Sequence, residues 1–87
     1  MLNRLDEVVR YRLIEERLER IRHALHNILP LINDIITLAP DDTRAAKYGW
    51  SLNDMIEKVI DTVDELLFVA KNEREALEIV KELEKLS

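Results

Sequence analysis

Two histidines, an acid and an amide lie close together in the first third of the chain. Glu19, His23, His26 and Asn27 are separated by steps of three and four residues, which places their side chains on one side of a helix. Imidazole and carboxylate groups are common metal ligands, but one helix supplies only part of a coordination shell and the chain has no cysteine to complete it. We therefore expect a solvated polar face here, with no metal and no other cofactor.

The segment around His23 also matches the pattern of a phosphoacceptor site. In the stretch His23-Ala24-Leu25-His26-Asn27-Ile28-Leu29, a His on a helix is followed four residues later by Asn and then by apolar residues. This stretch resembles the phosphoacceptor segment of histidine-kinase dimerisation domains, and the resemblance covers about residues 10–71. It implies a hairpin that dimerises as a four-helix bundle, with His23 in phosphotransfer. Ala24 stands where those domains carry an acid, so signalling through His23 is kept as an alternative function.

A second alternative is nucleic-acid binding through a dense run of arginines. The guanidinium group suits bidentate contacts with phosphate, but acids interleave with these arginines, and Asp6 with Arg10 and Glu16 with Arg20 have the i, i+4 spacing of helical ion pairs. We therefore expect ion pairs along this face and no nucleic-acid partner. The arginines are Arg10, Arg12, Arg17, Arg20 and Arg22.

Composition excludes several other functional classes. Bases and acids balance before residue 41, so the net charge of −5 comes from residues 41–87, which disfavours binding to phosphates or anionic membranes. No apolar run approaches the ~20 residues of a membrane span, and no signal segment is apparent, so we expect a cytoplasmic protein. The lack of Gln and Cys beside abundant Glu, Arg and Lys is typical of heat-adapted proteins. No nucleophile with a paired base and no phosphate-binding loop emerges, which predicts a non-enzyme.

The scarcity of helix breakers predicts an all-α protein with a single domain spanning residues 1–87. One Gly and two Pro interrupt the sequence. The first helix is expected from about Leu2 to Leu38. Pro30 lacks an N–H to donate to the carbonyl of His26, so we expect a kink or a break there.

The connection after the first helix predicts a short linking helix. Pro40 should stop the first helix, and Asp41 can cap a short helix at 42–48. Gly49 suits the left-handed residue that would close it.

Two further capping signals predict two C-terminal helices. Ser51 followed three residues later by Asp54 forms an acidic variant of the capping box, which predicts a helix at 52–71. Asn72 can cap a last helix at 73–86, bent from the previous one or folded back on it. Together with the kinked first helix and the short linker, this gives a lopsided helical hairpin.

Apolar residues at alternating steps of three and four predict a coiled-coil seam along both arms of this hairpin. The seam is too long for one chain to cover, so we expect hairpins to associate into a four-helix-type bundle, with a dimer favoured over a tetramer. The function expected first is therefore a non-catalytic module for self-association and interaction with another protein. The seam residues are Tyr11, Ile14, Leu18, Ile21, Leu25, Ile28, Ile32 and Ile35 on the first arm, and Leu52, Ile56, Val59, Val63 and Leu66 on the second.

Overall fold

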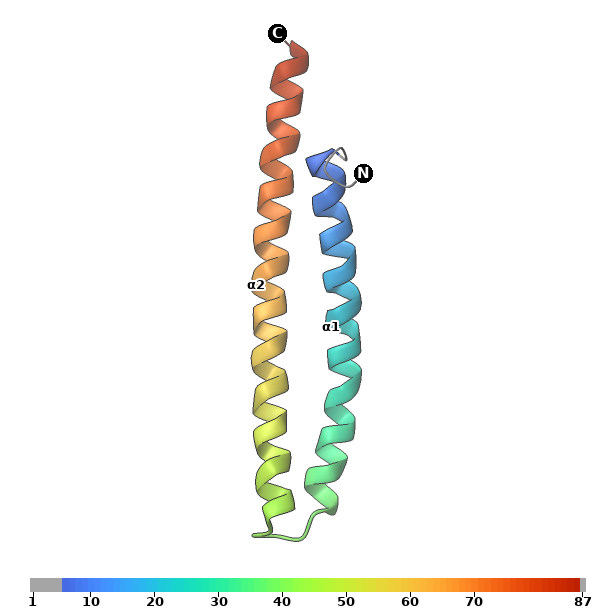
Figure 1. Cartoon of the computed structure of the whole chain (residues 1–87), viewed down its shortest axis with the longest axis vertical. Helices are drawn as coiled ribbons and strands as arrows, with labels where there is room; N and C mark the ends of the chain where they lie inside the picture. Colours follow the sequence, from blue (N-terminus) through green and yellow to red (C-terminus); the bar gives the residue numbers. More distant parts are fainter. Residues whose placement is uncertain (1–5, 87) are drawn as a thin grey trace.

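The computed structural model describes residues 6–86, which form two long helices. Helix α1 spans Glu7–Leu38, helix α2 spans Arg44–Leu86, and the short connection between them reverses the chain into an antiparallel hairpin (Figure 1). The molecule measures 68 × 22 × 17 Å. The last turns of α2 extend beyond the first turn of α1 (Figure 1). The prediction of an all-α hairpin is confirmed, whereas the predicted number of helices is wrong.

Helix α1 runs without a break through Pro30. It begins with a side-chain cap, in which the carboxylate of Asp6 accepts the N–H of Val8 at 2.8 Å, and it ends where Ala39 takes an extended conformation. Pro30 lies inside the helix, so the alternative of a break and restart at this residue is wrong. One lost hydrogen bond does not outweigh the packing of apolar side chains on both sides of it. The predicted helix start near Leu2 lies outside the described residues.

Helix α2 replaces the three helices predicted after residue 41. It is continuous over 43 residues, so residues 44–48 of the predicted linking helix, the helix at 52–71 and the helix at 73–86 are segments of one element, and residues 42–43 belong to the connection. The Ser51 hydroxyl donates to the carbonyl of Lys47 at 3.1 Å, an interior helix contact rather than a cap. A cap contributes only about 1 kcal/mol, which packing along the whole of α1 readily exceeds.

The turn between the helices uses different residues from those predicted. Asp42 is the left-handed residue, with φ 62°, whereas Gly49 is not. The Thr43 hydroxyl accepts the N–H of Ala46 at 3.3 Å and donates to the carbonyl of Pro40 at 2.7 Å. Thr43 therefore caps α2 in place of Asp41, because its hydroxyl joins the connection to the first turn of the helix.

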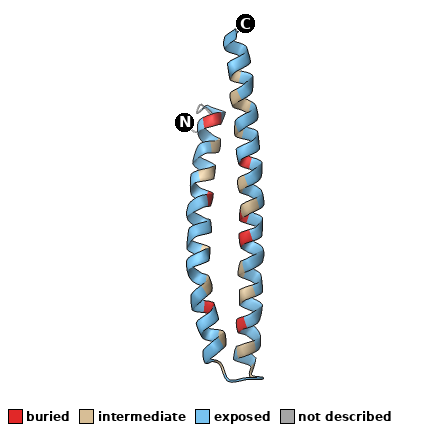
Figure 2. Cartoon of the chain, turned by 180° about the vertical axis from the view of Figure 1, so that it is seen from behind, coloured by how far each residue is buried: buried red, intermediate tan, exposed pale blue. Residues whose placement is uncertain are grey.

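The two helices meet along one line of mostly apolar side chains, which we call the hairpin seam. Its members are buried or half-buried and recur at steps of three and four, apart from one step of seven where Arg22 is exposed. The buried ones face the opposite helix (Figure 2). Each helix contributes a single line of side chains to the seam, so the core of the hairpin is thin. Its members are Val8, Tyr11, Glu15, Leu18, Leu25, Leu29, Ile32 and Ile36 on α1, and Ala46, Gly49, Asn53, Ile56, Ile60, Val63, Leu67, Ala70, Arg74, Leu77 and Lys81 on α2.

Candidate interaction surface

Each helix carries a second apolar line beside the hairpin seam, which we call the outer seam. It also steps by three and four, so each helix has two coiled-coil faces. All of its members are exposed in the single chain. They are Arg10, Ile14, Arg17, Ile21, Ala24, Ile28, Leu31, Ile35 and Leu38 on α1, and Ala45, Tyr48, Leu52, Met55, Val59, Thr62, Leu66, Val69, Glu73, Ala76, Val80 and Leu83 on α2.

The outer seams of the two helices lie on the same flank of the hairpin. In an antiparallel pair, equivalent heptad positions of the two helices share a flank. A guanidinium nitrogen of Arg12 lies 2.7 Å from a carboxylate oxygen of Glu78, which fixes one flank. Ile14 and Val80 each follow these residues by two positions, which places both on the other flank. The two lines therefore join into one broad apolar face that runs along the length of the hairpin.

The side chains of the outer seam keep a large exposed fraction. Ile21 is 47% exposed and Leu66 is 49% exposed, although both are large and apolar. The accessible surface of the chain is 7093 Å². A compact monomer of 10.3 kDa has about 5,400 Å². The radius of gyration is 19.5 Å, against about 12 Å for a compact chain of this length. One hairpin thus leaves apolar surface that a domain core normally covers.

The opposite flank is charged, and we call it the charged face. The Nε atom of Arg22 lies 2.9 Å from Oδ1 of Asp64 on α2. Within α1, the Nη2 atom of Arg20 lies 2.8 Å from Oε1 of Glu16. Asp6 pairs with Lys81 of α2 rather than with Arg10. Most of the N-terminal arginines are therefore already engaged with acids. The residues of this face include Arg12, Glu16, Glu19, His23 and His26 on α1, and Asp54, Glu57, Asp61, Asp64, Lys71, Glu75, Glu78, Glu82 and Lys85 on α2.

A polar cluster crosses the hairpin seam near the open end, the end away from the turn. Arg74 donates to both carboxylate oxygens of Glu15, at 2.6 and 3.2 Å, and their side chains are only 17% and 20% exposed. Glu78 accepts from Arg12 at 2.7 Å and from Arg74 at 3.2 Å. The hydrogen bond with Glu15 raises the pKa of Arg74, and the hydrogen bond from Arg12 lowers the pKa of Glu78. These hydrogen-bonded ion pairs join α1 to α2 and fix the register of the two helices.

The seam predicted from the sequence is divided between the two faces of the structure. The α1 residues at one heptad position belong to the hairpin seam, and the isoleucines at the other belong to the outer seam. Sequence reasoning missed the apolar residues that complete the outer seam, although their steps of three and four from the isoleucines are visible. Tyr11, Leu18, Leu25, Ile32, Ile56 and Val63 lie in the hairpin seam, whereas Ile14, Ile21, Ile28, Ile35, Leu52, Val59 and Leu66 lie in the outer seam.

The residues considered for metal binding or phosphotransfer are exposed on α1. His23 and His26 lie on the charged face, with Glu19 close by and Asn27 exposed at its edge. Within residues 6–86, no group of three or more His, Asp or Glu side chains is placed to hold a metal ion. His23 therefore stands on an open surface rather than in a pocket.

The aromatic residues near the turn are divided between the two flanks. Tyr48 lies on the outer seam, where its ring centroid is 5.9 Å from the guanidinium carbon of Arg44. Trp50 is exposed on the charged face, beside a hollow that Ile36 and Asp42 also line. The two rings thus form no single aromatic patch.

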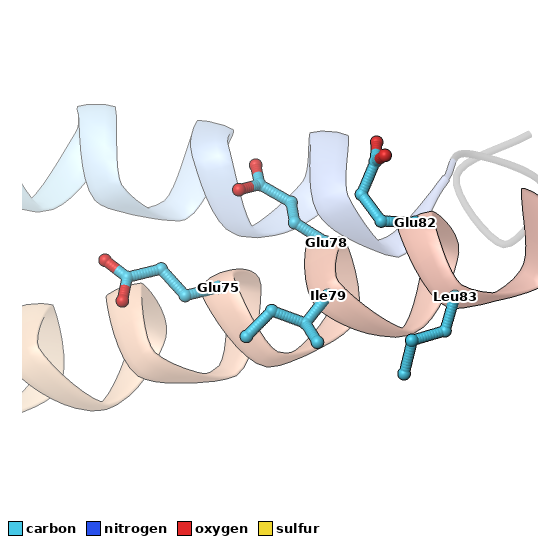
Figure 3. Close-up of a pocket in the computed structure, with 5 residues that line it drawn as sticks. All are labelled: Glu75, Glu78, Ile79, Glu82 and Leu83. Atoms are coloured by element: carbon cyan, nitrogen blue, oxygen red, sulfur yellow. The ribbon is translucent and has the colours of Figure 1, made fainter. Parts of the chain in front are cut away.

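The end of α2 carries a second small hollow (Figure 3). Ile79 and Leu83 project away from α1 there, whereas the carboxylates of Glu78 and Glu82 point toward it (Figure 3). Leu83 is the last member of the outer seam. The hollow therefore combines this one residue of the outer seam with Glu75, Glu78 and Glu82 of the charged face and with Ile79, which belongs to neither face.

Comparison of the chain with protein-family models, with curated proteins and with solved structures found no match. The helices that the structure describes include none that is long and apolar enough to cross a membrane.

Proposed function

We propose that this chain is a non-catalytic self-association module, in which two hairpins pack their outer seams together and form a four-helix bundle. The observation that carries the proposal is the outer seam itself, an exposed apolar line with coiled-coil spacing on both helices of one flank. The same spacing produces the hairpin seam, where it already holds two helices together. A second copy supplies a face of matching length, spacing and apolar character.

The area available fits a permanent homodimer. The chain exposes about 1,700 Å² more than a compact monomer of its mass, so two chains have about 3,400 Å² to bury between them. Stable interfaces bury ~1,600 Å² in total, and obligate dimers bury ~2,000 to 5,000 Å². Pairing of two hairpins therefore accounts for the surface excess without a third component.

The charged face and the hydroxyl groups of the chain support the non-catalytic part of the proposal. In the dimer it remains in water, where it is available to another protein. The hydroxyls of the four described Ser and Thr residues all donate to main-chain carbonyls within the helices or the turn, so none is held by a general base. The proposed dimer is cytoplasmic and presents a surface of paired charges rather than a reactive group.

Sedimentation equilibrium across a wide range of concentrations tests the proposal. The expected mass is twice the chain mass of 10.3 kDa. Val59→Lys places a charge in the outer seam and removes a side chain that is 44% exposed in the monomer. Its burial contributes about 1.5 kcal/mol per chain, so the variant dimer should dissociate about 100-fold more readily.

The chain offers a matched control for this substitution. Val9 has the same side chain and is 43% exposed, but it lies on the flank of the charged face. Val9→Lys should leave the dimer intact. A wild-type chain that stays monomeric and helical at millimolar concentration would overturn the proposal and assign the outer seam to a different protein. Equal effects of the two substitutions would also overturn it.

A further inference from the structure

We infer that the two hairpins of the dimer lie with their turns at the same end, and that Arg17 of each chain pairs with Glu73 of the other. This inference rests on the proposed function and adds the orientation of the partner copy. It starts from the charges of the outer seam. Only Arg10, Arg17 and Glu73 are charged in this otherwise apolar and uncharged line.

Arg17 and Glu73 lie at the same height along the hairpin. The ion pair of Glu15 with Arg74 joins the two helices at one level. Arg17 lies two residues nearer the turn than Glu15, and Glu73 lies one residue nearer the turn than Arg74. At about 1.5 Å of rise per residue, their heights differ by about 1.5 Å. Both residues also belong to the outer seam, so they would occupy one layer of the bundle.

The two charges are available for a contact between chains. Arg17 lies 3.4 Å from its sequence neighbour Glu16, a contact that leaves the side chain 61% exposed. Glu73 has no ion-pair partner among residues 6–86. The outer seam thus contains a cation and an anion of equal height that the single chain does not join.

Placing the turns at the same end brings these charges together twice. The two-fold axis that relates the chains then runs along the bundle. In this arrangement α1 of one chain faces α2 of the other, and each residue has the same height along the bundle in both chains. Arg17 meets the Glu73 of the second copy, and the reverse pair forms on the other side of the axis. The apolar members at equal heights also meet, with Ile28 opposite Val59. The layer of Arg17 and Glu73 therefore receives its counter-charges, whereas Arg10 takes no part in this pairing.

The opposite orientation leaves the same charges without partners. With the turns at opposite ends, each helix faces its own copy and heights are inverted about the middle of the hairpin. Arg17 then falls near Ile28 of the second copy, and Glu73 falls near Val59. Charges placed against apolar side chains lose hydration without a counter-charge, which disfavours this arrangement. One polar layer thus selects orientation as a single polar position does in coiled coils.

The hairpin itself uses the same device. Glu15 and Arg74 form the inner polar layer, with the acid on α1 and the base on α2. The outer layer carries the opposite assignment, with the base at Arg17 of α1 and the acid at Glu73 of α2. The reversed signs disfavour exchange of the two faces, because a face that docked onto the wrong seam would place like charges together.

Charge reversal tests the proposed pairs. Arg17→Glu alone places two acids opposite each other at both contacts between the chains, and Glu73→Arg alone places two bases there. Each variant homodimer should therefore weaken about 10-fold or more. An equimolar mixture of the two variants restores both pairs in the heterodimer. We expect the heterodimer to exceed its statistical share of one half, and the double variant to regain wild-type affinity. Mixing at the statistical ratio with no weakening of the homodimers would overturn the pairing.

Distance measurement tests the orientation independently. The chain has no cysteine, so Asp41→Cys in the exposed turn gives one spin-label site per chain. Turns at the same end should give a distance of about 20 to 40 Å between labels, within the width of two hairpins of 22 × 17 Å cross-section. Turns at opposite ends would give about 50 Å or more, close to the length of α1. A dimer with the long distance would refute only the inferred orientation. A monomer would refute the proposed function as well.

Discussion

The close approach of the helices near the turn gives a quantitative test of the fold. Gly49 lies in the interior of α2 and is buried against α1. A Cβ atom added there would lie 3.0 Å from Cγ1 of Ile36 and 3.8 Å from its Cα. Gly49→Ala therefore has two opposed effects, a gain in helix propensity and a steric contact with α1.

The magnitudes decide the sign. Replacing Gly with Ala in a helix interior gains about 1 kcal/mol, whereas overpacking a fitted contact costs about 1 to 3 kcal/mol. Gly49→Ala should therefore lower the free energy of unfolding by about 1 kcal/mol. Ile36→Ala removes the atom that obstructs the new methyl group. In that background, the same Gly49→Ala change should raise the free energy of unfolding by about 1 kcal/mol.

Urea unfolding at one fixed protein concentration measures both steps, because the stability of a dimer depends on concentration. The expected coupling between the two positions is about 2 kcal/mol. Ser51→Ala, at an exposed position two residues further along α2, reports helix propensity without a contact to α1 and should gain up to about 0.5 kcal/mol. If Gly49→Ala stabilised the chain equally in both backgrounds, the helices would not approach at Gly49 as described.

Further predictions concern the turn and the polar cluster. Thr43→Ala should destabilise the chain by about 1 kcal/mol, and Asp41→Ala by less than about 0.5 kcal/mol, in thermal unfolding; the reverse order would restore Asp41 as the cap. The neighbouring guanidinium groups lower the pKa of Glu78 from its ordinary value of 4.5, so its stabilisation is complete above that pH and is lost as the pH falls through the lower folded value. Glu78→Gln should therefore flatten the acid limb of the stability profile, and an unchanged limb would contradict this. Glu15→Leu should destabilise the chain more than Glu15→Leu combined with Arg74→Leu, because the single change removes both hydrogen bonds from the half-buried Arg74 to Glu15 and leaves it only its contact with Glu78; equal urea midpoints would refute that pairing.

The sequence alone was sufficient for the fold class and for part of each apolar line. Steps of three and four in apolar residues predict helices wherever they occur, and few breakers interrupt them, so two antiparallel arms follow from pattern and length. The ion pair of Glu16 with Arg20 was also predictable, because its partners lie one turn apart on one helix. These features depend on neighbours along the chain.

Helix boundaries and the division of the seam depended on contacts between the helices. Ser51 and Asn72 have the local signals of helix starts, but the hairpin seam runs past both, and its summed packing exceeds the contribution of a cap. A heptad pattern also does not state which of its positions faces the neighbouring helix. Ile14 and Tyr11 are equally good seam residues in sequence, and only the packing of α2 turns Tyr11 inward and leaves Ile14 exposed. The sequence determined the two apolar lines of each helix, whereas the tertiary structure decided which line closes the hairpin, because one helix can cover only one flank of another.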